Sequence, residues 1–132
     1  MRLLLDTHVL IWVLGTPERI RPSVLDMITD TANSVHVSVV SPWEIAIKSA
    51  AGRLQTEEYD LDGIATDLAT SGFALLPVVL EHALKVRHLP LHHADPFDRM
   101  LIGQALHEGM ALVTADRAIR AYDVPIVWTG RR

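Results

Sequence analysis

Short apolar runs, each followed by a segment with a helical pattern, recur along the whole chain and constrain its fold more than any other feature. The runs are rich in Val, Leu and Ile, which is typical of strands that are buried on both faces. We predict strands at residues 2–5, 35–40, 73–76, 111–114 and 126–128. We predict helices at residues 7–14, 22–31, 41–51, 61–70, 78–86 and 95–107, a helical turn at 117–121 and a polar loop at 55–60. This alternation indicates an α/β fold with a central, mostly parallel β-sheet flanked by helices on both faces.

The length and the composition fit one soluble unit with its own core. The chain has 132 residues, of which 49% are hydrophobic, and single domains most often have about 100–150 residues. We therefore expect a single domain over residues 1–132. No apolar run approaches the ~20 residues of a membrane span, and the run after Met1 ends at Asp6, so we expect no membrane association and a cytoplasmic location. The absence of cysteine excludes disulfides, thiolate catalysis and cysteine-bound zinc.

Four carboxylates fall at comparable places in the predicted fold. Asp6 follows the first strand and Asp116 follows the strand at 111–114. Glu44 and Asp98 lie in the predicted first turns of two helices. The carboxyl ends of parallel strands and the starts of the following helices share one edge of the sheet, where ligands bind. We therefore expect these side chains to converge in space although they are far apart in sequence.

Each acid also has a simpler interpretation as a helix cap. Ser41-x-x-Glu44 has the form of a capping box, and Asp95 before Pro96 is a suitable N-cap for the helix that contains Asp98. One cap contributes about 1 kcal/mol. Capping does not explain the whole set, because two carboxylates about 4 Å apart repel by roughly 4 kcal/mol at an effective dielectric constant near 20. A divalent cation that prefers oxygen ligands, such as Mg²⁺, would relieve that repulsion.

The net charge limits what such a site can bind. Lys and Arg total 12 and Asp and Glu total 16, which gives a net charge of −4. An acidic protein is not an obvious partner for a polyanion. Metal ions held by the acids would cancel part of this charge, and a pair of ions can clamp the attacking and leaving oxygens of a phosphodiester. The composition is therefore compatible with a metal-dependent nuclease that attracts phosphate once the metal is bound.

Four sequence blocks resemble the successive signatures of VapC toxins, which are PIN-domain ribonucleases of VapBC type II toxin–antitoxin systems. The blocks are Asp6-Thr7-His8-Val9-Leu10-Ile11-Trp12, Ser41-Pro42-Trp43-Glu44-Ile45-Ala46-Ile47-Lys48, Asp95-Pro96-Phe97-Asp98-Arg99-Met100-Leu101-Ile102 and Leu112-Val113-Thr114-Ala115-Asp116. Each block alone is weakly specific, but four in order over nearly the whole chain form a specific pattern. The chain departs from the family pattern at Ala94, where relatives often have Arg, and at Gly103, where Ala is usual. A glycine there would weaken the long helix by up to about 1 kcal/mol.

The resemblance implies a Mg²⁺-dependent endoribonuclease, with Mn²⁺ as a substitute, that hydrolyses RNA phosphodiester bonds by metal-activated water. It also implies a VapB-type antitoxin as partner, a toxin homodimer and a toxin–antitoxin hetero-oligomer. By the family motif, the catalytic and metal-binding acidic quartet corresponds to Asp6, Glu44, Asp98 and Asp116. We expect Asp6 and Asp98 to bind the ion directly and the other two acids to act through water or a second ion. Thr114 and Thr7 resemble hydroxyl residues near the scissile phosphate.

Two basic residues, one tryptophan and the histidines each have more than one interpretation. Arg99 and Lys48 are candidates for phosphate binding, although Arg99 could form an exposed salt bridge and Lys48 an i,i+4 pair with Glu44. Trp43 is expected as a core or interface anchor, or as a residue that flanks the groove. Despite seven histidines, we expect no histidine metal site, because His92-His93 lies in a predicted loop.

Two alternatives use the same acids differently. A non-catalytic PIN-like binding module would keep them only as helix caps, and it would not bind Mn²⁺ through Asp6. An aspartate-based phosphotransfer enzyme would use Asp6, at the end of its strand, as the nucleophile. Against this second alternative, the chain has His8 where a second Asp would be expected, and the partner lysine loop is not evident.

Overall fold

The computed structural model describes residues 1–52 and 61–130, which form an α/β fold around a five-stranded sheet. The strands are β1 (Arg2–Leu5), β2 (Ser34–Ser38), β3 (Ala74–Leu76), β4 (Ala111–Thr114) and β5 (Ile126–Trp128). They lie in the order β3-β2-β1-β4-β5, and each pairs in parallel with its neighbours. The predicted fold class is confirmed, and this sheet is parallel throughout. The predicted loop at 55–60 lies outside the described residues.

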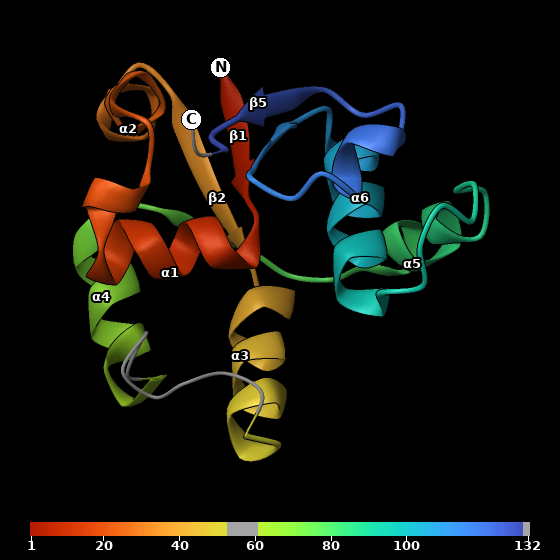
Figure 1. The fold of residues 1–132 in the computed structure, drawn as a ribbon, viewed down its shortest axis with the longest axis horizontal. Helices are drawn as coiled ribbons and strands as arrows, with labels where there is room; N and C mark the ends of the chain where they lie inside the picture. The colour runs from red at the N-terminus through yellow and green to blue at the C-terminus, as the bar shows by residue number, and fades with distance from the viewer. Residues whose placement is uncertain (53–60, 131–132) are drawn as a thin grey trace.

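Six α-helices are present in the described part of the chain (Figure 1). They are α1 (Thr7–Gly15), α2 (Pro22–Thr29), α3 (Val40–Ala50), α4 (Ile64–Ser71), α5 (Leu80–Val86) and α6 (Pro96–Glu108). Short 3₁₀ helices occur at Pro17–Arg19, Leu61–Gly63 and Ile119–Ala121. None of the helices in residues 1–52 and 61–130 has the length and apolar character needed to cross a membrane.

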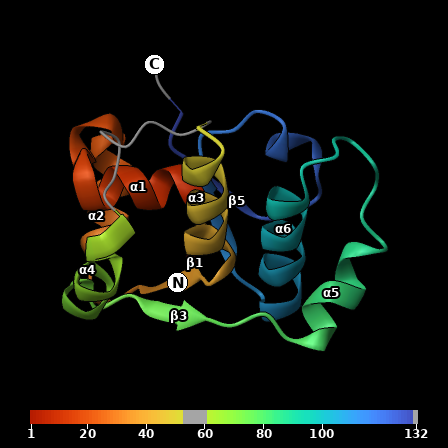
Figure 2. The ribbon, with the colours of Figure 1, turned by 90° about the horizontal axis from the view of Figure 1, so that it is seen from below.

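Alternating side chains of the central strand divide the core into two layers. Leu3 and Leu5 of β1 face α1, α2 and α4, whereas Leu4 faces α6, and α5 packs against α6. All three leucines are fully buried. Figure 2 shows α1, α2 and α4 on one side of the strands and α5 and α6 on the other. Helices therefore flank both faces of the sheet, which explains why its strands are almost continuously apolar.

The start of α3 differs from the prediction, and the difference changes the interpretation of Glu44. Strand β2 ends at Ser38, and helix α3 begins at Val40 rather than at Ser41. The Val40 N–H donates to Ser38 Oγ at 3.0 Å. Ser41 is therefore already inside the helix, and Glu44 lies beyond its first turn. The predicted capping box is wrong, so the Ser41 and Glu44 side chains are available for contacts outside their own helix.

Helix α6 is capped as predicted and packs unusually close to α5. The Asp95 carboxylate accepts hydrogen bonds from the backbone N–H groups of Phe97 and Asp98 at 2.9 and 3.2 Å. A Cβ atom added at Gly103 would lie 3.0 Å from Val86 Cγ2 and 3.2 Å from the His82 carbonyl oxygen. Glycine at this position therefore does more than weaken the helix, since it allows the two helix backbones to approach closely.

Candidate metal centre

The predicted acidic residues lie around the carboxyl ends of β1 and β4. Asp6 directly follows β1, and Asp116 comes two residues after β4. Helices α3 and α6, which carry Glu44 and Asp98, pack against each other, and α1 packs against α3. In Figure 1, α3 begins immediately below the ends of β1 and β2. The parallel sheet thus brings these segments to one edge, as the strand-end argument predicted.

Asp6 is buried and held by two hydrogen bonds. Its Oδ1 accepts from the Thr7 backbone N–H at 2.8 Å, and its Oδ2 accepts from the Thr114 hydroxyl at 2.8 Å. Only 5% of the residue is exposed. Burial raises the pKa of Asp6 to about 6, although the hydrogen bonds from Thr114 and Thr7 oppose the rise. The carboxylate is therefore fixed in orientation but not neutralised by these neighbours.

Glu44 is held by a hydroxyl pair and a lysine. The Thr7 hydroxyl lies 2.7 Å from Glu44 Oε1 and 3.0 Å from Ser41 Oγ, and all three residues are buried. The Lys48 ammonium pairs with Glu44 Oε2, which confirms the i,i+4 ion pair. Burial alone would lower the pKa of Lys48, but the hydrogen bond and the charge of Glu44 outweigh it and the pKa is raised. Lys48 therefore remains charged and offsets the Glu44 carboxylate.

Asp98 is the carboxylate on which the other acids act most strongly. It is 7% exposed, and its Oδ2 lies 3.2 Å from His93 Nε2. The pKa of Asp98 is raised to about 8, first by burial and then by the negative charges of Asp6, Asp95, Asp116 and Glu44. The structure thus brings the predicted quartet together around Asp98. Their mutual repulsion is the electrostatic cost that a bound cation would remove.

Thr114 connects two members of the quartet. Its hydroxyl donates to Asp6 Oδ2 and accepts from the Asp116 backbone N–H at 3.0 Å, and the residue is fully buried. Asp116 itself is exposed, and its Oδ1 accepts from the Ala118 N–H at 2.9 Å. Thr114, like Thr7, therefore orients carboxylates from within the chain. These bonds occupy the hydroxyls that were predicted to lie near the scissile phosphate.

The guanidinium of Arg99 contacts Tyr122 and the segment that connects α5 to α6. It donates to the Tyr122 hydroxyl at 3.0 Å and to the Pro90 carbonyl at 2.9 Å, and it also contacts the Val86 and Leu89 carbonyls. Each of these carbonyls belongs to the connection between α5 and α6 or to the end of α5. The geometry therefore assigns Arg99 to holding this connection, which leads into Asp95 and Asp98.

Two residues beside the quartet were not predicted. Ser41 contributes its hydroxyl to the Thr7 pair, and the sequence signal for it was assigned to a capping box. His93 bridges Asp98 and Tyr122, with its Nδ1 2.8 Å from the Tyr122 hydroxyl. His93 lies in an irregular connection, where no periodic pattern indicates the direction of a side chain.

The donor set fits a hard divalent cation that keeps part of its water shell. Among residues 1–52 and 61–130, no three His, Asp or Glu side chains are arranged to ligate one ion together. Mg²⁺ commonly binds through one or two carboxylates and retains several waters, so a closed cage of protein ligands is not required. The buried carboxylates Asp6 and Asp98, which have raised pKa values, offer such a pair of oxygen donors.

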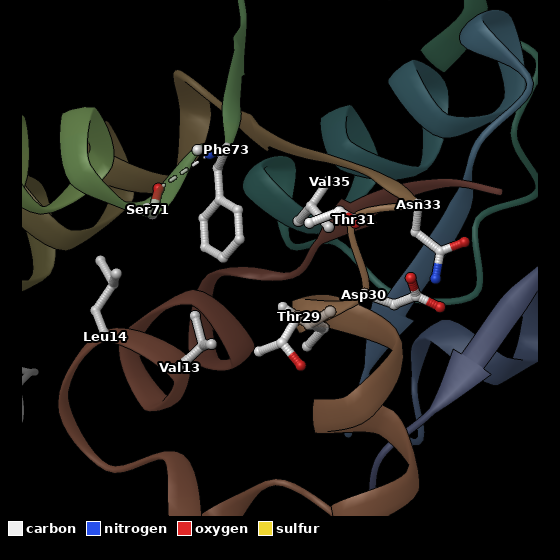
Figure 3. A pocket seen from close by; sticks show the side chains of 11 residues that line it. Val13, Leu14, Thr29, Asp30, Thr31, Asn33, Val35, Ser71 and Phe73 are labelled. Carbon is white, nitrogen blue, oxygen red and sulfur yellow. Dashed lines mark hydrogen bonds between the residues drawn. The ribbon is translucent and has the colours of Figure 1, made fainter.

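A separate cavity of about 420 Å³ lies at the amino-terminal edge of the sheet, among α1, α2 and α4. Figure 3 shows the apolar side chains of Phe73, Val13 and Leu14 around it, with the polar side chains of Asp30 and Asn33 nearby. The eight residues predicted for the site are not among those that line this cavity. The candidate metal centre therefore lies at the opposite edge of the sheet.

Comparison with known proteins identifies the family of this chain. Residues 3–125 match the family model described as PIN domain, and this range includes the whole quartet. The chain belongs to the PIN domain family. This PIN domain is 28% identical over 133 residues to Ribonuclease VapC22 of Mycobacterium tuberculosis (strain ATCC 25618 / H37Rv), with 92% of each chain covered. The predicted resemblance is thereby confirmed at the level of the family.

Solved structures show that the fold is shared with VapBC proteins. The structure of VapBC2 from Rickettsia felis bound to a promoter DNA fragment matches with a TM-score of 0.74 and 13% identity, covering 98% of this chain and 99% of that one. DNA-bound VapBC from Salmonella typhimurium matches with a TM-score of 0.70 and 15% identity, covering 96% and 97%. VapBC-5 from Mycobacterium tuberculosis matches with a TM-score of 0.61 and 20% identity, covering 98% of each chain. At these identities, the likeness establishes the fold of the PIN domain.

Proposed function

We propose that this PIN domain is a Mg²⁺-dependent endoribonuclease, with Mn²⁺ as a substitute, and the toxin component of a type II toxin–antitoxin system. The observation that carries the proposal is the buried Asp98 carboxylate, whose pKa is raised by burial and by four surrounding acids. In the metal-free protein a proton on Asp98 relieves this repulsion, and a bound divalent cation would relieve it while the carboxylate stays ionised. RNA as the substrate is supported by the relative named Ribonuclease VapC22. The proposal includes one catalytic domain over residues 1–132 and action in the cytoplasm.

The roles of the residues follow from their contacts. Asp6 and Asp98 would hold the ion, and the other two acids would act through water or a second ion. A bound Mg²⁺ supplies positive charge to the phosphate and activates water. Thr114 orients Asp6, and Thr7 orients Glu44.

The cations differ in their access to substrate. The Lys48 side chain is 25% exposed beside Glu44, so we propose it as the phosphate contact. Arg99 would act indirectly, because its guanidinium holds the connection that leads into Asp98.

The direct test is cleavage of a cellular RNA mixture by the purified protein. We expect endonucleolytic products with added Mg²⁺ or Mn²⁺ and none after chelation, because the carboxylates alone repel the phosphate. Binding of Mn²⁺ measured by calorimetry supplies the control. A protein that neither binds Mn²⁺ nor cleaves RNA would instead fit the non-catalytic binding module.

We further propose a VapB-type antitoxin as partner and a toxin–antitoxin hetero-oligomer. The support is that several solved structures with this fold are VapBC complexes. The carboxylates also suit such a partner, because an arginine from a bound tail would neutralise them by charge-assisted hydrogen bonds. Mixing the protein with its antitoxin should therefore suppress RNA cleavage and metal binding together.

We also propose that the toxin forms a homodimer through an apolar patch on β3, α5 and the segment between them. The exposed apolar side chains of this patch are Leu75, Val78, Val79, Leu80 and Leu84. Strand β3 is also an edge strand of the sheet. Exposed apolar side chains that are grouped within one short stretch of the chain are a feature of protein interaction surfaces.

Substitution Leu80→Asp is expected to convert the dimer to a monomer, because Leu80 is 68% exposed in one chain and a charge would be buried without a partner in the dimer. Light scattering gives the mass directly. The matched control is Leu91→Asp, at a residue that is 82% exposed outside the patch and should leave the mass unchanged. A monomeric parent protein, or a dimer that survives Leu80→Asp, contradicts the proposal.

A further inference from the structure

Trp43 is an exposed aromatic residue directly beside the candidate metal centre. It precedes the buried Glu44 in α3, yet 58% of Trp43 is exposed. Its ring meets Phe97 edge to face, with ring centroids 5.1 Å apart and planes at 77°. Phe97 in turn precedes Asp98 in α6. The aromatic pair is therefore fixed by the same two helices that carry two of the four acids.

The geometry leaves the indole available for stacking. An edge-to-face contact covers at most one face of the Trp43 ring, and the exposure of the residue indicates that another part of the ring meets solvent. The Lys48 ammonium lies 5.8 Å from the centroid of the Phe97 ring and forms an ion pair with Glu44. A flat apolar surface, a cation and the carboxylates thus lie together, which matches the base, phosphate and metal that a nucleotide would present.

We propose that Trp43 is the stacking platform for an unpaired base of the RNA, next to the phosphate at the metal centre. This inference rests on the RNA-cleaving function proposed above and adds the residue that would bind a base. Bases inside a duplex are already stacked on their neighbours, so only an unpaired base can lie on the indole. Purines have the larger π surface, and a purine is therefore expected at this nucleotide.

The test measures binding separately from cleavage. Cleavage-resistant phosphorothioate linkages in the probes prevent turnover and leave the metal centre intact. The probes are fluorescein-labelled single-stranded oligo(A) and the same strand with abasic nucleotides, followed by fluorescence anisotropy in Mg²⁺. Trp43→Leu is expected to weaken oligo(A) binding about tenfold, the effect of losing one base stack. Trp43→Phe retains an aromatic face and should stay close to the parent protein. Binding of the abasic strand should be the same in both variants.

Trp128 supplies the matched control, because the guanidinium of Arg120 already lies over its ring at 4.6 Å. Trp128→Leu should leave oligo(A) binding unchanged. The inference is overturned if Trp43→Leu binds oligo(A) as the parent does, if it weakens abasic binding equally, if it changes the oligomeric mass, or if oligo(A) does not bind at all. Base-dependent binding without cleavage by the wild-type protein would overturn only the hydrolase function, so the two failures are distinguishable.

Discussion

Asp98→Asn is expected to lower the rate of RNA cleavage by about 10³-fold while stabilising the metal-free protein. The loss follows because metal-ion catalysis contributes several kcal/mol, and each 1.36 kcal/mol changes the rate tenfold. The gain in stability follows because burial and four neighbouring acids penalise an ionised Asp98. An asparagine has the shape of the acid without the charge, and its amide can still form a hydrogen bond with His93 Nε2. Substitution of a residue with only a structural role would not lower the cleavage rate and raise the stability of the metal-free protein at the same time.

The matched control for this experiment is Asp95→Asn, the same substitution three residues earlier. Asp95 caps α6 through Oδ1, and asparagine is an equally good N-cap, so both the helix and the cleavage rate should be nearly retained. Single-turnover cleavage with excess protein gives the rate, and thermal unfolding in chelator gives the stability. Full activity of Asp98→Asn, or an equal loss of cleavage rate in Asp98→Asn and Asp95→Asn, would contradict the proposed metal centre.

Asp98 is a better position for this test than Asp6. Both oxygens of Asp6 accept hydrogen bonds, one from the Thr7 N–H and one from the Thr114 hydroxyl. The amide of asparagine would replace one of these acceptors with a donor and leave a buried group unsatisfied, which costs roughly 1–3 kcal/mol. A loss of activity in Asp6→Asn would therefore mix a change of charge with a change of fold.

The order of elements and the edge that carries the acids were predictable because they depend on local and topological rules. Leu3, Leu4 and Leu5 form a continuous apolar run, which indicates a strand covered on both faces, and such sheets are parallel. Parallel strands place their carboxyl ends at one edge, so Asp6 and Asp116 were expected at the same edge. That they are neighbours there follows from the pairing of β1 with β4, which the sequence pattern did not give. Asp95 was predictable as an N-cap because the cap contacts only the next three residues.

The contacts inside the site could not be predicted in the same way. Thr7 pairs with Ser41 and Glu44 across 34 and 37 residues, and this pairing replaces the local capping box that the sequence suggested. Trp43 and Phe97 meet only because α3 and α6 pack together. Such contacts depend on the exact approach of two elements, whereas the sequence pattern gives only which face of each is apolar.

The stability of the metal-free protein is expected to fall as the pH rises from 5 to 8. The pKa of Asp98 is about 8 and that of Asp6 about 6 in the fold, whereas an unperturbed aspartate has a pKa of about 3.9. Between these values the folded chain holds more protons than the unfolded chain, so raising the pH favours unfolding. The penalty is absent below about pH 4 and fully present above about pH 8.

The measurement is urea unfolding in chelator at pH 5 and pH 8, for the parent protein and for Asp98→Asn. The variant should lose less stability across this interval, because its side chain at position 98 does not ionise. Glu108 has a lowered pKa, caused first by the hydrogen bond from His82, and the stability it contributes is lost only as the pH falls through that pKa. The contribution of Glu108 to stability therefore changes below pH 5, and it does not mask the difference between the parent protein and Asp98→Asn.

Added Mg²⁺ should reverse the effect of pH, since it binds the ionised carboxylates of the folded chain and shifts the equilibrium by mass action. The metal should raise the unfolding temperature of the parent protein at pH 8 more than at pH 5, where protons compete for the same oxygens. In Asp98→Asn the metal should have little effect at either pH. If the parent and the variant instead showed the same pH dependence and the same response to Mg²⁺, Asp98 would ionise as freely as a solvent-exposed acid, and the repulsion on which the metal site depends would not exist.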